Sequence, residues 1–500
     1  MYELTEEKVN ALYLKFKSRA KTYIGKKKLD EAIPYIEAAA YTAYTFGLGF
    51  VDDDIEEFLK ECANYLIRTE DVYYDANACV FYDFYSKDNA GLTQQYVRAI
   101  LNAGYKLTYI TERNDFMSSP SGIKRLLDSY NRTTVIELPS GVKGMARAQY
   151  LYDAIVGAHA SKLFIHSNPR VVHANIAFSV LPPQIERYKI NLTDHAFWIG
   201  SSCLDYTLEF ANYGCNLSHY YRRIPKHNIL HLPFYPIMDN SEFLGFPDEC
   251  RGKFVVFSGG AFYKIFDKKD DYFKLCRAIC DVSPDIVILF AGENNKTVIE
   301  EKIKRHKLTG RFFLLGYRQD ITACFENCDV YLNTYPIGGG LMTQYAAQKG
   351  KPVLSFHDGK RRKVEEYTCQ KGVIQISSNS FEEIQTKIGK MLHDKNYYDR
   401  LSEEIRSCVI CPEEFDQYFQ RALVQKQTPV HINWANGFKP IPFDLKDKLT
   451  YENKNHNFQL ITSKIFGKQS WRVCPSCLIL AFITIVSEGR LFSFFRNHKG

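Results

Sequence analysis

DVYLNTYPIGGGLMTQYAAQKGKPVLSF, residues 329–356, contains a strand, a glycine-rich turn, a helix and a second strand in close succession. The apolar run VYL at 330–332 predicts the first strand. Three consecutive glycines, Gly338, Gly339 and Gly340, then let the backbone approach a ligand closely, and the free N–H groups at the start of the next helix favour an anion. The pattern therefore predicts a βαβ unit with an anion site in its turn, although similar turns also occur without a ligand.

The length and charge of the chain limit the classes of protein it can be. Its 500 residues exceed the usual size of one hydrophobic core, so two or more domains are expected. The net charge of +7 is mild and fits an anionic ligand or a membrane surface, and no Lys/Arg tract with interleaved aromatic residues indicates nucleic-acid binding. The polar start MYELTEEKVN has no signal sequence, and the cysteines show no paired framework spacing. We therefore expect a cytoplasmic protein without disulfides.

Two CxxC pairs raise the question of structural zinc. Cys408 pairs with Cys411, and Cys474 pairs with Cys477. Zinc ribbons place their two pairs about fifteen to twenty residues apart, and these pairs are much farther apart than that. We expect buried thiols and no metal site.

The first part of the chain, residues 1–72, is predicted to be a small helical domain. Apolar residues such as Leu29, Ile33, Ile36 and Ala40 follow helical spacing without strand-like alternation. The segment is faintly similar to one tetratricopeptide helix, but an array needs about three repeats. Packing against the next domain is therefore expected rather than partner binding.

Strands and helices then alternate in two series, which predicts two α/β domains, residues 73–245 and 246–427. Each would be a Rossmann-like parallel sheet covered by helices. The carboxyl edges of the two sheets would enclose a cleft, where open α/β sheets bind ligands. A helix at 413–425 is expected to return towards the first of these domains.

The last segment, residues 428–500, shows no regular period and is predicted to be an irregular basic and apolar tail. Its apolar run CLILAFITIV, residues 477–486, is shorter than the roughly twenty residues that span a bilayer. We expect a buried strand or helix here. The alternative is peripheral membrane contact supported by Arg490, Arg496 and Lys499.

Tandem Rossmann-like domains with a glycine-rich turn in the second resemble the GT-B glycosyltransferases, most closely the O-GlcNAc-transferase-like branch. Three segments carry the resemblance: FSGGAFYKIFD at 257–267, LLGYRQDI at 314–321, and the glycine-rich turn with the GKPVLS that follows it. The resemblance covers roughly residues 75–426 and is firmer in the second domain.

The resemblance implies a nucleotide-sugar site, with Lys264 on the lysine that contacts the donor diphosphate and Arg318 beside the nucleotide. Negative charge gathers on the leaving diphosphate, so a cation and oriented N–H groups would lower the barrier. The alternative for Lys264 is a solvated lysine in a loop, and the alternative for Arg318 is a surface arginine. The expected donor contacts are Gly259, Gly260, Lys264, Gly316, Arg318, Gly338, Gly339, Gly340, Thr343 and Gln344.

The sequence departs from the family pattern at two positions. Tyr345 stands where many GT-B enzymes carry an acidic residue that holds the donor ribose, and Ile321 stands where the family has a histidine. Either Gln344 supplies a neutral hydrogen bond to the ribose, or the donor is bound in another way, or the protein is an inactive homologue that binds a partner.

In the first domain, YDFYSKDNAGLTQQY at 82–96 resembles the first strand and loop that face the cleft. Asp83 ends the strand and is a candidate catalytic residue. Lys87, Asp88 and Gly91 are expected on the acceptor side. Capping of the following helix is the alternative role of the two aspartates.

His195 is the candidate base, because a base near neutral pH must take the proton of the acceptor hydroxyl and Asp194 beside it would tune the imidazole. His166, His173 and His219 rank lower, and a purely structural histidine is the commoner case.

Two further groups are weighed from the sequence. The stretch that contains Asp205 and Glu209 resembles the family's strand and helix before the domain linker, and His231 falls where that linker starts. Asp205 is therefore expected on the acceptor side, in a supporting or structural role. The cluster HDGKRRK at 357–363 is predicted to be a solvated charge run, with contact to an anionic donor or a lipid phosphate as the alternative.

The sequence thus predicts a metal-independent GT-B glycosyltransferase without a cofactor. By resemblance the donor is a UDP-sugar and the chemistry is inverting. A glycan or lipid-linked saccharide is the expected acceptor because no tetratricopeptide array is present. The DxD triplet at 52–54 lies in the helical domain and is assigned no role. A non-catalytic homologue that binds a partner enzyme or glycan, and a nucleotide-sugar epimerase, remain alternatives.

Overall fold

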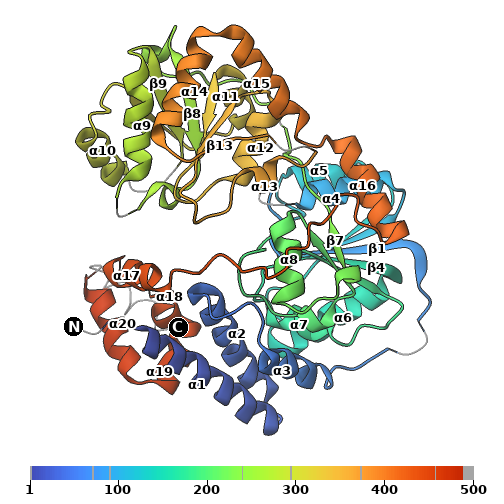
Figure 1. The fold of residues 1–500 in the computed structure, drawn as a ribbon. Coiled ribbons are helices and arrows are strands. Elements are labelled where there is room, and N and C mark those ends of the chain that lie inside the picture. Colours follow the sequence, from blue (N-terminus) through green and yellow to red (C-terminus); the bar gives the residue numbers. More distant parts are fainter. Residues whose placement is uncertain are drawn as a thin grey trace.

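The computed structural model describes residues 3–69, 72–88, 92–238, 240–267, 269–292, 296–371, 374–455 and 458–487. Two α/β domains and a unit of helices make up the molecule (Figure 1). The helical unit contains both the N-terminal helices and those of the C-terminal segment, which lie side by side although they are far apart in the sequence.

The first sheet has seven parallel strands in the order β3-β2-β1-β4-β5-β6-β7. Its strands are β1 (Asp75–Asp83), β2 (Lys106–Thr111), β3 (Thr133–Glu137), β4 (Ala160–His166), β5 (Glu186–Ile190), β6 (Tyr206–Glu209) and β7 (Ile229–His231). The helices of this domain are α4 (Thr93–Asn102), α5 (Gly122–Asp128), α6 (Gly144–Gly157), α7 (Val172–Phe178) and α8 (Asn212–Tyr220). Apolar runs such as β4, which is buried from Leu163 onward, are typical of strands covered on both faces.

The second sheet has six strands in the order β10-β9-β8-β11-β12-β13, the strand order of a dinucleotide-binding Rossmann domain. Its strands are β8 (Phe254–Gly259), β9 (Ile286–Ala291), β10 (Phe312–Gly316), β11 (Val330–Leu332), β12 (Val353–Phe356) and β13 (Ser377–Ser378). The helices around it are α9 (Asp271–Val282), α10 (Lys296–Arg305), α11 (Ile321–Asn327), α12 (Gly340–Gln348), α13 (Glu365–Thr368), α14 (Phe381–His393) and α15 (Lys395–Ser407). The order reverses between β8 and β11, so ligands of such a sheet bind where these two strands end.

A long helix joins the second domain back to the first, as the sequence predicts. α16 (Pro412–Gln425) packs Phe415 and Phe419 into the core of the first domain, where both contact the ring of Tyr96. Full burial of an aromatic side chain is worth about 1.5–3 kcal/mol, so this helix fastens the two domains together.

The N-terminal helices are α1 (Glu6–Gly25), α2 (Leu29–Phe46) and α3 (Asp53–Ala63). The N-terminus of α3 explains the DxD triplet: Asp52 caps the helix through the amide of Ile55 and pairs with Lys17, which also pairs with Asp54. These carboxylates are therefore already used in local structure.

The expectation of an irregular tail agrees with residues 428–444, which contain no helix or strand, and is wrong for the described part of residues 445–487. This segment forms α17 (Leu445–Asn455), α18 (Gln459–Thr462), α19 (Phe466–Val473) and α20 (Ser476–Ser487). The apolar residues of these helices share one core with α1 and α2. The sequence shows no helical period here because the helices are short and are stabilised by packing against α1 and α2, which are far away in the sequence.

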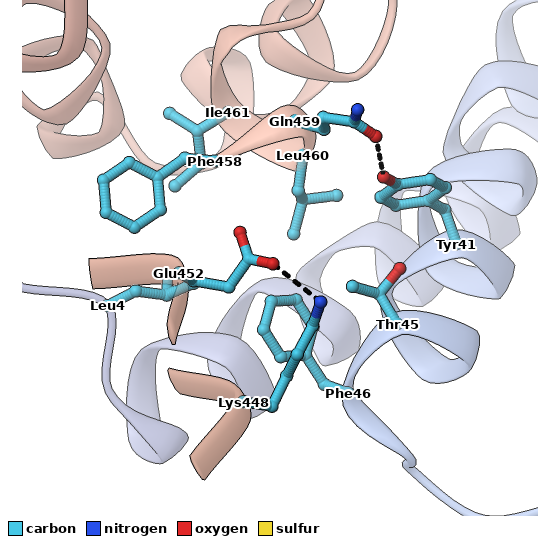
Figure 2. Close-up of a pocket in the computed structure, with 10 residues that line it drawn as sticks. All are labelled: Leu4, Tyr41, Thr45, Phe46, Lys448, Glu452, Phe458, Gln459, Leu460 and Ile461. Carbon is cyan, nitrogen blue, oxygen red and sulfur yellow. Dashed lines mark hydrogen bonds and ion pairs between the residues drawn. The ribbon is translucent and has the colours of Figure 1, made fainter. Parts of the chain in front are cut away.

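Figure 2 shows how closely the tail meets α2. The hydroxyl of Tyr41 donates to Gln459 at 2.6 Å, and the side chains of Phe46, Phe458 and Ile461 line the same small pocket. Glu452 is buried there and is neutralised by Lys448 at 2.7 Å. The helices from the two ends of the chain therefore form one unit. Within the described residues, no helix combines the length and the hydropathy that a membrane crossing requires.

Candidate functional site

The glycine-rich turn lies at the carboxyl end of β11, as predicted, and is held by side chains of the residues before it. Asn333 accepts a hydrogen bond from the amide of Gly339 at 2.9 Å. The hydroxyl of Thr334 donates to the carbonyl of Ile337 at 2.7 Å. These two bonds fix the turn at the place where α12 begins.

Two of the three glycines are required by one aromatic ring. A Cβ atom built on Gly338 would lie 2.6 Å from the hydroxyl oxygen of Tyr367, and one built on Gly340 would lie 2.8 Å from its ring. A Cβ on Gly339 would meet Tyr331 at an ordinary 3.6 Å. Gly338 and Gly340 therefore allow the backbone to pack closely against Tyr367 of α13, besides any close approach to a ligand.

Lys264 lies directly beside this turn. It belongs to the short 3₁₀ helix η4 (Phe262–Ile265) that follows β8, and its carbonyl accepts the amide of Ile337 at 3.2 Å. Its stem passes over Gly260, whose φ of 142° only glycine adopts readily. Among the described residues its ammonium has no hydrogen-bond or ion-pair partner, and burial lowers the pKa of Lys264. A partly desolvated, unpaired cation next to a helix start is a site for an anion.

The other predicted glycines lie at the same sheet edge. Gly259 ends β8 under Met342, and Gly260 donates its amide to the carbonyl of Ala291 at 2.9 Å. Gly316 ends β10 with a φ of 71°. The structure thus brings Gly259, Gly260 and Lys264 together with the turn.

The prediction that Arg318 contacts the nucleotide is not supported by its surroundings. Its guanidinium is held by Asp320, with the Nε atom 2.7 Å from Oδ1, and it also donates to the carbonyl of Gly245 at 2.8 Å. It lies over the rings of Phe243 and Phe246. Arg318 therefore anchors the linker between the two domains and is neither a surface arginine nor a free cation.

The residues on α12 that were expected to meet the donor are buried. The hydroxyl of Thr343 donates to the carbonyl of Gly339 at 2.8 Å, and Gln344 donates to the carbonyl of Tyr367 at 2.9 Å. The oxygen Oε1 of Gln344 is buried without a hydrogen-bond partner in the described part of the chain. The hydroxyl of Tyr345 donates to the carbonyl of Ile237 at 2.7 Å, in the linker. This arrangement presents neither Gln344 nor Tyr345 as a free group for a ribose.

The predicted solvated cluster 357–363 is only partly solvated. Lys360 and Lys363 are exposed, but Arg362 is mostly buried. Arg362 crosses to the first domain, where it forms an ion pair with Asp194 at 2.6 Å. Asn333, Thr334, Gly338, Arg361, Arg362 and Tyr367 line one pocket at this edge of the second sheet, together with neighbouring residues.

In the first domain, Asp83 and His166 form a buried pair that the sequence did not single out. They end the neighbouring strands β1 and β4 in register, and Nδ1 of His166 lies 2.8 Å from Oδ1 of Asp83. Tyr109 and Thr93 donate to the other oxygen of Asp83 at 2.6 and 2.8 Å. Burial alone would raise the pKa of Asp83, but His166 and these donors outweigh it and lower the pKa.

This geometry changes the roles expected for the two residues. Asp83 is fully buried and saturated with donors, so it orients His166 and does not itself face a substrate. The Nε2 atom of His166 is buried without a partner among the described residues. An aspartate that fixes one ring nitrogen of a histidine leaves the other nitrogen for proton transfer. His166 is only 1 % exposed, so its Nε2 atom can meet a substrate only when the residues over it move apart.

His195 is 67 % exposed on the loop after β5, and its Nδ1 lies 3.3 Å from Asp194. Asp194 itself is committed to Arg362, which lowers the pKa of Asp194 against the effect of burial. Nε2 of His173 lies 2.8 Å from the carboxylate of Glu112, and Nδ1 of His219 donates to the carbonyl of Ile224 at 3.0 Å.

The acceptor-side predictions divide. Asp88 caps α5 rather than α4, accepting the amides of Gly122 and Ile123 at 2.5 and 3.0 Å, and Lys87 is exposed beside it. Gly91 lies outside the described residues. The prediction that Asp205 lies on the acceptor side is wrong. Asp205 precedes β6 and pairs with Arg187 at 2.8 Å, so it lies at the amino edge of the sheet, away from the carboxyl edge where ligands bind.

The helical unit also reaches this region. Tyr85 follows β1, and Tyr263 precedes Lys264. The pKa of each is raised by burial and, to a smaller extent, by the neighbouring Tyr44 of α2. Arg170, in the loop after β4, lies over the rings of Tyr41 and Tyr44. Helix α2 is therefore close to both α/β domains where their carboxyl edges meet.

No group of three metal-ligating side chains occurs in the part of the chain that the structure describes. All fourteen cysteines are free thiols.

Comparisons with known proteins agree with this architecture. Residues 255–407 match the family described as Glycosyl transferases group 1, and these residues include Lys264 and the glycine-rich turn. Among solved structures, HepE of Anabaena, crystallised with UDP and glucose, is similar with a TM-score of 0.50 and 12 % identity over 70 % of this chain and 99 % of that one. The chain has the GT-B fold.

Two further GT-B structures extend the comparison. A glycosyltransferase of Rickettsia africae has a TM-score of 0.51 and 11 % identity, covering 71 % of this chain and 99 % of its own. The O-GlcNAc transferase of Thermobaculum terrenum has a TM-score of 0.50 and 13 % identity, covering 88 % of this chain and 83 % of its own. The predicted resemblance to GT-B enzymes is confirmed at the level of the fold. No curated protein gives a significant match to the sequence.

Proposed function

We propose that this protein is a glycosyltransferase that takes a sugar from a nucleotide diphosphate donor, with a UDP-sugar as the expected donor. The observation that carries the proposal is Lys264: an unpaired, partly buried ammonium bonded through its backbone to the glycine-rich turn. A diphosphate bound beside the turn would pair with this cation and with amides of the first turn of α12. The match of residues 255–407 to a glycosyltransferase family supports the same reading.

The base that takes the acceptor proton is proposed to come from the first domain. His166 is oriented by Asp83 and has an unpartnered Nε2, whereas His195 is exposed and only loosely bonded to Asp194. An imidazole that a carboxylate holds in one orientation is the better-organised base, so we give His166 precedence over His195. The proposal requires that acceptor binding uncovers the buried Nε2 atom.

The acceptor is proposed to be a glycan or a lipid-linked saccharide, and transfer is proposed to need no metal ion. Two paired helices, α1 and α2, do not provide the long groove of a tetratricopeptide array. Tyr44 lies near Tyr85 and Tyr263, and aromatic rings of this kind suit the apolar face of a sugar ring.

A second function is favoured by one observation. Gln344 and Tyr345 are both bonded inward, so the usual hold on a donor ribose is missing. This would suit a non-catalytic homologue that binds a partner enzyme or glycan.

The experiment that separates these readings is incubation of the purified full chain with a panel of nucleotide sugars, followed by analysis of the nucleotide and sugar products. Release of UDP that increases with a glycan or lipid-linked acceptor supports transfer. Binding without turnover supports the non-catalytic homologue, and a new nucleotide sugar without an acceptor identifies an epimerase. Absence of binding to every donor contradicts the proposal.

A further inference from the structure

Helix α20 (Ser476–Ser487) carries no charged residue and leaves one apolar face open to solvent. Cys477, Leu480 and Ala481 are buried, because α20 packs against α18 and α19. The side chains that remain exposed are all large and apolar: Leu478 at 48 %, Ile479 at 48 %, Phe482 at 59 % and Val486 at 45 %. A contiguous apolar surface of this kind marks a contact with another apolar phase or partner.

The position of α20 leaves this face accessible. Figure 1 shows α20 at the outer edge of the helical unit, on the side away from both α/β domains. About half of the surface of Phe482 and of Leu478 is left open to solvent by the described part of the chain.

Basic residues lie on the elements that neighbour α20. Residues 453–487 contain no Asp or Glu. Lys464, Lys468 and Arg472 are exposed on and just before α19, which contacts α20. Lys15 of α1 lines the same hollow as Cys477 and Leu480. The elements next to α20 are therefore predominantly basic, with the exposed Glu6 and Glu7 at the start of α1 as the acidic residues of the same neighbourhood.

The sequence that follows has the same character. Residues 488–500 contain one acid, Glu488, and they repeat the combination of large apolar and basic side chains: Arg490, Leu491, Phe492, Phe494, Phe495, Arg496 and Lys499. The structure does not describe these residues, and only their composition enters the argument.

We propose that α20 and the basic residues around it dock the protein on an anionic lipid surface. The twelve-residue helix is about 18 Å long, well short of the roughly 30 Å of a hydrocarbon core, so it would lie in the plane of the interface. Leu478, Ile479 and Phe482 enter the boundary between headgroups and acyl chains, while Lys468 and Arg472 pair with lipid phosphates. A protein partner that carries both charges would not require mainly basic residues around the apolar face.

This inference does not depend on the proposed glycosyl transfer, because the surface is separate from the Lys264 site. If both hold, docking brings the cleft to a lipid-linked acceptor. Failure of one leaves the other standing.

The test is flotation of the full chain with vesicles of phosphatidylcholine alone or with added phosphatidylglycerol. The wild type is expected to float with the anionic vesicles and to be released by salt. The double variant Ile479→Ser with Phe482→Ser should lose about tenfold or more of its partitioning, since each side chain removes apolar surface that would be buried in lipid. Lys468→Glu with Arg472→Glu should lose the preference for anionic vesicles.

The controls are Val424→Ser and Lys304→Glu, which change exposed residues on α16 and α10, far from α20. Both should float like the wild type. The proposal is overturned if the wild type does not float with anionic vesicles, or if the serine variant binds them as tightly. It is also overturned if size-exclusion chromatography shows that the wild type is a dimer which the serine variant dissociates, because a second copy then covers the face.

Discussion

Arg362 of the second domain forms an ion pair with Asp194 of the first, with Nη1 2.6 Å from Oδ2. The guanidinium also lies over the rings of Tyr213 in the first domain and Tyr367 in the second. Tyr367 in turn packs against Gly338 and Gly340. The loop that carries Asp194 is therefore connected, contact by contact, to the turn proposed to hold the diphosphate.

Removing either partner of this pair should destabilise the protein more than the pair itself is worth. Asp194→Asn leaves Arg362 with Glu366 at 3.3 Å as its remaining partner, and Arg362→Met leaves the buried Asp194 with only His195 at 3.3 Å. Breaking a buried pair costs up to about 3–5 kcal/mol, and the larger cost is expected for Arg362→Met. The double variant should cost much less than the sum of the two, as measured by urea unfolding. The matched control is the exposed pair Arg223 and Asp53, for which little or no coupling is expected because solvent screens it. Additive effects at Asp194 and Arg362 would contradict the contact.

The glycines of the turn should differ in their tolerance of alanine. Gly340→Ala places a methyl group against the Tyr367 ring and should cost about 1–3 kcal/mol, whereas Gly339→Ala meets only ordinary contacts. Thermal unfolding of the two variants gives the comparison. Adding Tyr367→Leu to Gly340→Ala should recover part of the loss, and equal damage at Gly339 and Gly340 would show that the ring is not the cause.

His231 should make stability depend on mildly acidic pH. Burial lowers the pKa of His231 from 6.5 to about 4. Below pH 6.5 the unfolded chain takes up a proton that the folded chain refuses until about pH 4, so stability falls by about 3 kcal/mol across this window. Urea unfolding of His231→Gln should show a shallower fall over the same range. The exposed His393→Gln serves as the control and should follow the wild type.

The two candidate bases can be distinguished by turnover with the best donor and acceptor found. His166→Gln should lower kcat by about a hundredfold or more without a matching change in donor affinity, and His195→Gln should have a small effect. Asp83→Asn should shift the pH profile of kcat, because it alters the tautomer and orientation of His166. A large loss at His195 with none at His166 would reverse the assignment.

The sequence predicts the framework well because the framework depends on local pattern. Apolar runs such as 330–332 and the glycines that end them define strands and turns wherever they occur, and the parallel order follows from the alternation of strand and helix. Lys264 was found in the same way, since it follows β8 closely and must emerge at the edge shared with the turn.

What the sequence missed depends on contacts across the fold. Arg318 lies near the predicted edge, but Asp320 two residues away and the carbonyl of Gly245 determine its direction. His166 and Asp83 are far apart in the chain, and only the pairing of β1 with β4 brings them together. A histidine and an aspartate that each end a strand were the available signal. The tail could not be predicted because its helices gain stability from α1 and α2.

The most direct test of the central claim is the affinity of the full chain for UDP, measured by isothermal titration calorimetry on the wild type, Lys264→Ala, Lys264→Arg and the distant control Lys304→Ala. A charge-assisted bond to a phosphate is worth about 1.5–3 kcal/mol, so Lys264→Ala should bind about tenfold to a hundredfold more weakly. Lys264→Arg should retain part of the affinity, and Lys304→Ala should match the wild type. If the wild type binds UDP and Lys264→Ala binds it equally well, the diphosphate is held elsewhere and the proposed site is wrong.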